Sequence, residues 1–245
     1  MNLNCDLGES FGAWTMGMDE VVIPLIDQAN IACGFHASDP LILYRTVSMV
    51  VHQGVEIGAH PSYPDLVGFG RRSMALSEEE LKTLIWYQIG ALDGMASMLG
   101  SRVTYVKPHG AMNNDMMRSD TQLRAVMGAV ADFRNDLKLM IPVTLNWQSH
   151  QAMAGEFGLE LIMEAFADRA YDDRGQLVAR SAAGSVFHDE AEIVAQAQTF
   201  SDRGGAYSVT GQWLDLPAQS LCVHGDNPES VQAVKAIRAA LVKAE

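Results

Sequence analysis

The sequence has little cysteine. Cys5, Cys33 and Cys222 are the three cysteines among 245 residues, and no two of them are spaced as CxxC. Neither a disulfide framework nor a thiolate zinc site is indicated, which suits a reducing cytoplasm. We expect all three to be small buried residues on the apolar faces of their strands.

Positive charge is also scarce. Thirty Asp and Glu against seventeen Lys and Arg give a formal net charge of −13. This charge opposes long-range attraction to nucleic acid or to an anionic membrane. An anionic small substrate would therefore depend on a few local cations, and the candidates are Lys107, Arg71, Arg72, Arg169 and Arg180.

Long apolar runs are missing too. No run reaches the roughly 18 residues of a membrane span, and the N-terminus has neither the basic start nor the apolar core of a signal peptide. We expect a soluble cytoplasmic protein without membrane or nucleic-acid partners. Because 48% of the residues are apolar and no linker or repeat interrupts the chain, residues 1–245 are expected to form a single domain.

Short β-rich segments alternate with helical ones along the chain. Strands are expected at 2–7, 29–34, 55–60, 104–109, 138–145, 159–167 and 220–225. Helices are expected at 40–53, 77–100, 119–134, 147–157, 189–202 and 228–243, with a hairpin or irregular excursion at 203–219. Such alternation implies right-handed parallel crossovers, which leaves a doubly wound sheet or a closed β/α barrel.

The polar residues of the predicted strands favour the barrel. Side chains alternate between the two faces of a strand. Within each of the seven predicted strands, the polar side chains fall on the same face. They are Asn2, Asn4 and Asp6; Asn30 and His36; Glu56 and His60; Lys107 and His109; Thr144 and Asn146; Glu160, Glu164 and Asp168; His224 and Asp226. A seven-stranded barrel would point this polar face into its lumen, and barrel enzymes keep their active sites at the strands' C-terminal ends.

Chemistry assigns roles within this cluster. Asp6 is a candidate general base or metal ligand, and His60 and His109 are candidate acid–base groups. Lys107 could hold a carboxylate, a phosphate or a developing oxyanion, or could pair with a neighbouring lumen carboxylate. Substrate contacts are expected from Asn4, Asn30, His36, Arg72, Glu164, Arg169, His224 and Asp226.

Two further sites remain open. Asp6, His36 and His60 could supply one oxygen and two nitrogens to a divalent metal, although their spacing in the sequence does not test this. Residues 68–72 (Gly-Phe-Gly-Arg-Arg) could surround an anion with N–H groups and guanidinium groups, or could be a solvated loop with turn glycines. His52, His150 and His188 are interpreted as ordinary surface or capping histidines.

Six ordered motifs carry a family resemblance. They are Asn4-Cys-Asp6-Leu-Gly-Glu9, Ala29-Asn-Ile-Ala-Cys-Gly-Phe-His36, Gly58-Ala-His60-Pro-Ser-Tyr-Pro-Asp65, Val106-Lys-Pro-His109-Gly-Ala111, Glu164-Ala-Phe-Ala-Asp168-Arg-Ala-Tyr171 and Cys222-Val-His-Gly-Asp226. Together they resemble the LamB/YcsF family, whose members are A subunits of ATP-dependent 5-oxoprolinase. Ser38 departs from the usual Gly of the family, and Asn113 stands where the family has Tyr.

The resemblance implies a seven-stranded β/α barrel similar to the glycoside hydrolase/deacetylase superfamily. It further implies hydrolysis of the lactam of 5-oxo-L-proline to L-glutamate, ATP with Mg as co-substrate, and partner subunits B and C. Phosphorylating the lactam oxygen would need cations, for which Lys107, Arg169 and Arg72 are candidates, and an acid–base set, for which Asp6, His60 and His109 are candidates.

Two alternatives stay open from the sequence. One is a metal-dependent amide or ester hydrolase, deacetylase-like, acting on a sugar derivative. The other is a noncatalytic subunit that binds the substrate and passes it to partners, because a binding site and an active site both need converging polar groups.

Overall fold

Seven parallel strands close into a barrel. The computed structural model describes residues 1–242, and the end of the helix expected to reach 243 lies outside them. The strands are β1 (Asn2–Leu7), β2 (Gln28–Ala32), β3 (Glu56–His60), β4 (Tyr105–Val106), β5 (Lys138–Pro142), β6 (Glu160–Phe166) and β9 (Ser220–Val223), hydrogen-bonded in that order. The barrel closes because β9 pairs with β1 on one side and with β6 on the other. The expected barrel is thus confirmed.

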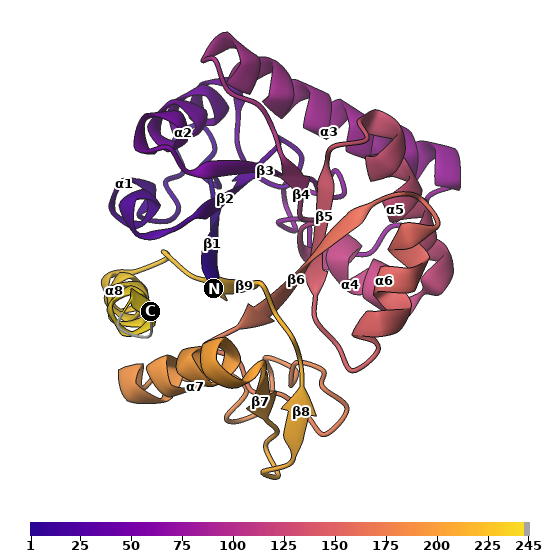
Figure 1. The fold of residues 1–245 in the computed structure, drawn as a ribbon. Helices are drawn as coiled ribbons and strands as arrows, with labels where there is room; N and C mark the ends of the chain where they lie inside the picture. The colour runs from indigo at the N-terminus through magenta and orange to yellow at the C-terminus, as the bar shows by residue number, and fades with distance from the viewer. Residues whose placement is uncertain (243–245) are drawn as a thin grey trace.

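Helices surround the barrel on its outside (Figure 1). They are α1 (Asp19–Val22), α2 (Pro40–Gln53), α3 (Glu78–Met98), α4 (Gly110–Arg118), α5 (Asp120–Phe133), α6 (Trp147–Gly155), α7 (Glu190–Arg203) and α8 (Pro228–Val242), with a 3-10 turn η1 (Ile23–Leu25) after α1. No described helix is both long and apolar enough to cross a membrane.

Local sequence signals begin the main helices. Ser77 caps α3 through the amide of Glu80, whose side chain bonds back to the Ser77 amide, so the predicted capping box is present. Asp39 caps α2 and Pro40 follows at its first position. Residues 203–219 contain an antiparallel pair, β7 (Gly205–Tyr207) and β8 (Trp213–Asp215), as the hairpin prediction expected.

The two faces of the strands divide as the parity predicts. Leu3, Ile57 and Val106 are fully buried and belong to the apolar core that also includes residues of the surrounding helices. The other face fills the lumen with polar and aromatic side chains. Tyr105 crosses that lumen, and its hydroxyl donates to Asn30 Oδ1 at 2.7 Å. Gly58 on β3 makes room for it, because a Cβ there would overlap the Tyr105 ring.

The fourth strand is shorter than expected. Regular pairing on both sides covers only Tyr105 and Val106, whereas 104–109 was predicted. The backbone nevertheless continues to bond to the β3 side, since Lys107 N–H donates to Ala59 O and His109 N–H to Pro61 O, both at 2.8 Å. Pro108 has no N–H to donate, so the chain leaves the sheet at this point and begins α4. The sequence analysis did not predict α1 or α4.

Candidate active site

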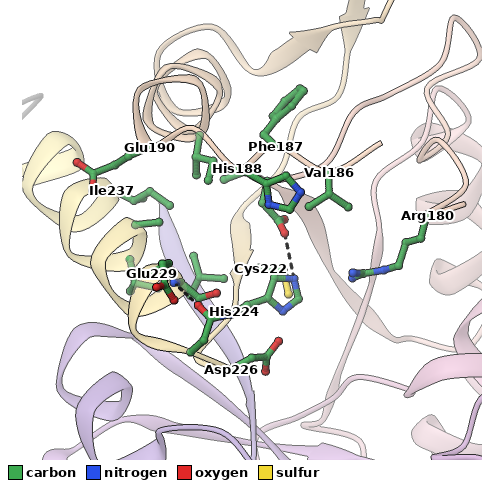
Figure 2. A pocket seen from close by; sticks show the side chains of 18 residues that line it. Arg180, Val186, Phe187, His188, Glu190, Cys222, His224, Asp226, Glu229 and Ile237 are labelled. Carbon is green, nitrogen blue, oxygen red and sulfur yellow. Dashed lines mark hydrogen bonds and ion pairs between the residues drawn. The ribbon is translucent and has the colours of Figure 1, made fainter. Parts of the chain in front are cut away.

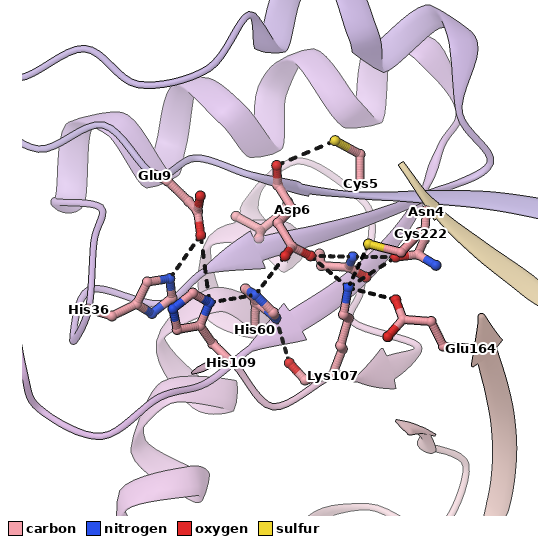
Figure 3. Close-up of polar contacts among 12 residues, drawn as sticks. Asn4, Cys5, Asp6, Glu9, His36, His60, Lys107, His109, Glu164 and Cys222 are labelled. Atoms are coloured by element: carbon pink, nitrogen blue, oxygen red, sulfur yellow. Dashed lines mark hydrogen bonds and ion pairs between the residues drawn. The ribbon is translucent and has the colours of Figure 1, made fainter. Parts of the chain in front are cut away.

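Lys107 lies at the centre of the polar lumen (Figure 3). Its ammonium contacts Asp6 Oδ1 at 2.8 Å and Glu164 Oε1 at 2.7 Å, and it donates to Asn4 Oδ1 at 3.2 Å. Strands β1, β6 and the end of β4 therefore converge on one cation. Of the two roles left open for Lys107, the ion pair with lumen carboxylates is present.

The charges of this cluster support one another. Burial alone would raise the pKa of Asp6, but the charges and hydrogen bonds of His60 and Lys107 hold it well below its usual range. Burial likewise opposes the charge of Lys107, yet Asp6 and Glu164 help to keep its pKa well above the usual value. A carboxylate held ionised in this way is a weak general base. Asp6 is better suited to orient His60 than to take a proton from water.

An amide layer supports the charged cluster from below. Asn4 Nδ2 donates to Ser220 Oγ at 2.8 Å, and Asn30 Nδ2 donates to both Asn4 Oδ1 and Asp6 Oδ1 at 2.8 Å. Both asparagines are fully buried, so they sit under the cleft rather than on its wall. Their role in this structure is to position Asp6 and Lys107.

His60 and His109 meet through one ring nitrogen each. His60 Nδ1 lies 2.6 Å from the carbonyl of Lys107, and His109 Nε2 lies 2.9 Å from the carbonyl of Phe69. Because carbonyls only accept, each of these nitrogens carries hydrogen. The remaining nitrogens, His60 Nε2 and His109 Nδ1, face each other at 3.0 Å. Asp6 Oδ2 lies 3.4 Å from His60 Nε2 on the other side of this pair.

His36 and Glu9 complete the cluster. The His36 ring stacks on His109 with ring centroids 3.8 Å apart and planes 5° from parallel. Its Nε2 lies 3.3 Å from Glu9 Oε1, and its buried Nδ1 has no hydrogen-bond partner. Burial, with the charge of His60 next, lowers the pKa of His36 well below its usual value. Burial, followed by His36 and His60, lowers the pKa of His109 to about 2.

These residues do not fit one metal ion as they stand. Single donor atoms of Glu9, His36, His60 and His109 lie within 4.8 Å of one another. An imidazole lone pair lies in the plane of its ring, however, and two rings stacked at 3.8 Å cannot both point their lone pairs at a common ion about 2.1 Å away. The set expected from sequence also differs, because Asp6 is absent from this group and Glu9 and His109 are present.

A cleft of about 520 Å³ opens over the cluster. Its cations are Arg71 after β3, Lys107 and Arg118 after β4, and Arg169 and Arg180 after β6. Its acidic residues are Asp6, Glu9, Glu164 and Asp226, and His60, His109, His224 and Asn113 also line it. In a chain of net charge −13, the lining of this cleft thus brings cations together in numbers that offset its carboxylates.

The loop between β3 and α3 supports one wall of the cleft. Asp65 accepts hydrogen bonds from the Gly68 amide at 2.9 Å and from Arg72 Nε at 2.9 Å. The hydrogen bonds of Arg72 come first among the causes that lower the pKa of Asp65 to about 2. Gly70 has φ +64°, and a Cβ there would lie 2.8 Å from His109 Cδ2. The amides of 68, 70, 71 and 72 bond within the loop, so they do not form the anion nest that the sequence left open.

A second pocket of about 440 Å³ adjoins the cleft (Figure 2). Helices α7 and α8 supply an apolar wall with Ile193, Val234 and Ile237, and Phe187 precedes α7. The pocket shares Arg180, Cys222, His224 and Asp226 with the cleft. His224 Nε2 lies 3.4 Å from Asp168 Oδ2 at this junction. His188, interpreted as an ordinary histidine, lines the pocket as well.

The structure brings most of the predicted site together. Asp6, His60, Lys107, His109, Glu164, Arg169, His224 and Asp226 line the cleft. Arg72 is not part of that lining: its guanidinium pairs with Asp65, and its side chain is 65% exposed. Arg71 lines the cleft in its place. The guanidinium of Arg169 already donates hydrogen bonds to the carbonyls of Ser185 and Val178, so only part of its donor capacity faces a substrate.

Two features of the site differ from the sequence analysis. Glu9 was not selected, although it stands in a quoted motif two residues beyond β1. Cys222 was assigned to the apolar face, which is wrong, because its Sγ lies 3.5 Å from Lys107 Nζ inside the barrel. Its parity is that of His224, and the signal was therefore available. Burial raises the pKa of Cys222 well above its usual value, so its thiol stays protonated.

Fold and site together define a β/α-barrel protein with a buried, charged acid–base cluster beneath a cleft that arginines and carboxylates line. The sequence model of the LamB/YcsF family matches residues 1–245. The chain belongs to the LamB/YcsF family.

Relatives support this assignment along nearly the whole chain. A protein of Pseudomonas fluorescens (strain Pf0-1), named as the A subunit of 5-oxoprolinase, is 55% identical over 239 residues, which cover 98% of this chain and 96% of that one. A Vibrio cholerae protein of the same name is 48% identical and covers 98% and 97%. The crystal structure of a lactam utilization protein from Thermus thermophilus superposes with a TM-score of 0.92 at 39% identity, covering 99% and 96%.

Proposed function

We propose that this chain is the A subunit of an ATP-dependent 5-oxoprolinase. In this role it would hydrolyse the lactam of 5-oxo-L-proline to L-glutamate, with ATP and Mg as co-substrate and with subunits B and C as partners. Relatives at 48–55% identity bear the name of that subunit, which supports the proposal. The observation that carries it is the acid–base cluster of His60, His109 and Glu9 at the floor of a cleft lined by arginines.

The cavities suit a reaction with two substrates. A five-membered lactam is small, whereas ATP needs more room and more positive charge. The cleft and the adjoining pocket share Arg180 at their junction, so a larger molecule could extend from one into the other. Lys107 is already neutralised by its two carboxylates, and Arg118 lies 3.9 Å from Asp115. Arg71 is therefore the candidate cation for the substrate carboxylate or for phosphates.

The deacetylase-like alternative is less well supported. A metal-dependent hydrolase would need the cluster to converge on one ion, and the stacking of His36 on His109 opposes this. A putative cellobiose-phosphate cleavage protein from Enterococcus faecalis V583 superposes with a TM-score of 0.56 at 10% identity, which is a likeness of fold alone.

Reconstitution tests the proposal. This chain, alone and assembled with subunits B and C, is supplied with 5-oxoproline and MgATP, and glutamate and ADP are measured. We expect glutamate only from the complete complex, because the sequence contains no phosphate-binding loop of the P-loop type. His109→Asn should lower turnover by about 100-fold or more, whereas His52→Asn, on the outer helix α2, should not.

Three outcomes would overturn it. The first is glutamate formation by subunits B and C without this chain. The second is full turnover with His109→Asn, which would leave this chain the role of a noncatalytic binding subunit. The third is ATP-independent deacetylation of an acetylated sugar by this chain alone, together with one tightly bound metal ion per chain.

A further inference from the structure

Glu9 differs from the other carboxylates of the cleft. Asp6 and Glu164 each contact the Lys107 ammonium, whereas within residues 1–242 no lysine or arginine forms an ion pair with Glu9. Its Oε1 lies 3.3 Å from His36 Nε2 and 3.7 Å from His109 Nδ1. The side chain is 15% exposed, and that exposure is toward the cleft. Glu9 can therefore exchange a proton with a molecule bound there.

Opposing influences set the pKa of the Glu9 carboxyl. Burial raises its pKa most, and the negative charges of Asp6 and Asp226 raise it further. The positive charges of His60 and Arg71 lower it. The result is a pKa of about 7, which is the range in which a group serves best as acid or base near neutral pH.

The backbone and His36 hold Glu9 in place. Gly8, with φ +70°, turns the chain directly after β1, and its amide donates to Asp19 Oδ2 at 2.9 Å. The carbonyl of Ser10 accepts from the Ser38 amide at 3.0 Å. His36 is fixed by its stack on His109, so its Nε2 presents a directed contact to Glu9. His36 is thus a positioning residue.

We propose that Glu9 is a catalytic acid–base residue of the cleft, an inference that rests on the proposed lactam hydrolysis. Glu9 takes one proton from the attacking water while the water oxygen bonds the lactam carbon. The carbon–nitrogen bond breaks with its electron pair on nitrogen, and Glu9 passes the proton that it took from water to this nitrogen. The carboxylate of Glu9 is thereby restored.

The test is the pH profile of the assembled complex with Glu9→Gln and Glu9→Asp. In the wild type, kcat should fall as the pH drops below about 7, because a protonated Glu9 cannot accept a proton. Glu9→Gln should lower kcat by about 10²- to 10⁴-fold, leave KM within a few-fold, and abolish the dependence on pH in that range. Glu9→Asp should recover part of kcat together with a pH limb.

The matched control is Glu20→Gln, which removes an exposed carboxylate on α1 and should keep the wild-type profile. The inference is overturned if Glu9→Gln keeps kcat within about threefold of wild type, or if its residual activity retains the same acid limb. Infrared difference spectra of this chain between about pH 5.5 and 8.5 provide a readout independent of turnover. A carboxyl band that titrates near pH 7 in the wild type and is lost in Glu9→Gln supports the inference, and its absence overturns it.

The two proposals fail separately. If the wild-type complex makes no glutamate, the proposed function falls while the infrared measurement still decides on Glu9. If the complex is active and Glu9→Gln is too, only the assignment of Glu9 falls.

Discussion

At the scale of single residues, burial decides what an ion pair contributes. Two Lys–Glu pairs in this protein have the same length, 2.7 Å. In the lumen, the side chains of Lys107 and Glu164 are 7% and 1% exposed. On the surface, those of Lys138 and Glu160 are 38% and 66% exposed. Water screens the second pair and is nearly absent from the first, so the two pairs should respond very differently to loss of one partner.

Replacing the lysines measures this difference. Lys107→Met leaves Asp6 and Glu164 without their cation in the lumen, and we expect it to lower the free energy of unfolding by about 3–5 kcal/mol. Lys138→Met should change that free energy by less than about 1 kcal/mol. Urea unfolding followed by circular dichroism checks both. Equal effects of the two substitutions would show that Lys107 is not the electrostatic centre of the lumen.

Residue-level prediction worked where a strand imposes alternation. Asp6, His60 and Lys107 each stand on the polar face that alternation predicts for their own strands, and the structure places all three at the cleft. Alternation ends with the strand, so nothing in the sequence pattern indicated that Glu9, two residues beyond β1, turns back over the same site. The same limit applies to the loop after β3, where adjacent arginines diverge: Arg71 lines the cleft and Arg72 pairs with Asp65.

At the scale of elements, the packing of β4 against β3 depends on a glycine, because the Tyr105 ring needs the space that a side chain at residue 58 would fill. Gly58 on β3 pairs with Tyr105 on β4, and the Tyr105 ring occupies the space where a Cβ of residue 58 would be. Gly94 offers a contrast within α3, because it is exposed and a Cβ there would meet no atom within 4 Å.

Alanine substitution should therefore destabilise the protein at Gly58 and stabilise it at Gly94. Gly58→Ala forces the Tyr105 ring to move in a filled lumen, and we expect a loss of about 1–3 kcal/mol in the free energy of unfolding. Gly94→Ala should stabilise the protein by about 0.5–1 kcal/mol, because glycine in a helix interior carries an entropic cost. Thermal melting of both variants decides. An unchanged melting temperature for Gly58→Ala would show that the Tyr105 ring can move aside in the lumen without loss of stability.

Element prediction was most accurate where capping and periodicity agree. The range of α2 was predicted to the residue, and β1 likewise. The short strand β4 was predicted too long because Lys107 and His109 alternate as strand residues do while bonding to β3 alone. Helix α4 was missed because it begins at Gly110 directly after this segment and is short, and its polar run 113–115 interrupts a narrow apolar face of Ala111, Met112 and Met116.

At the scale of the whole molecule, the first and last strands complete each other. Strand β9 lies between β1 and β6 and is bonded to both. Without it, two strands would expose unpaired edges, and the lumen would lose Cys222 and the wall that carries His224. The site therefore forms only when the chain has been assembled to its last strand.

Truncation tests this dependence. A chain ending at residue 219 lacks β9 and α8, and we expect it to lose the single cooperative melting transition of the full chain. Val209→Ser, which alters an exposed residue between β7 and β8, should keep that transition. Calorimetry distinguishes the two cases. A truncated chain that still melts cooperatively would show that the barrel does not depend on its closure.

The carbonyl of Phe69 has one more consequence. It determines which nitrogen of His109 bears hydrogen, and it belongs to a residue whose φ of +54° is unusual for anything but glycine. A main-chain carbonyl of a loop, and not a side chain, thus sets the tautomer of His109. Substituting side chains of that loop will leave this contact in place, whereas a small rotation of the peptide plane of Phe69 would break it and free His109 to adopt the other tautomer.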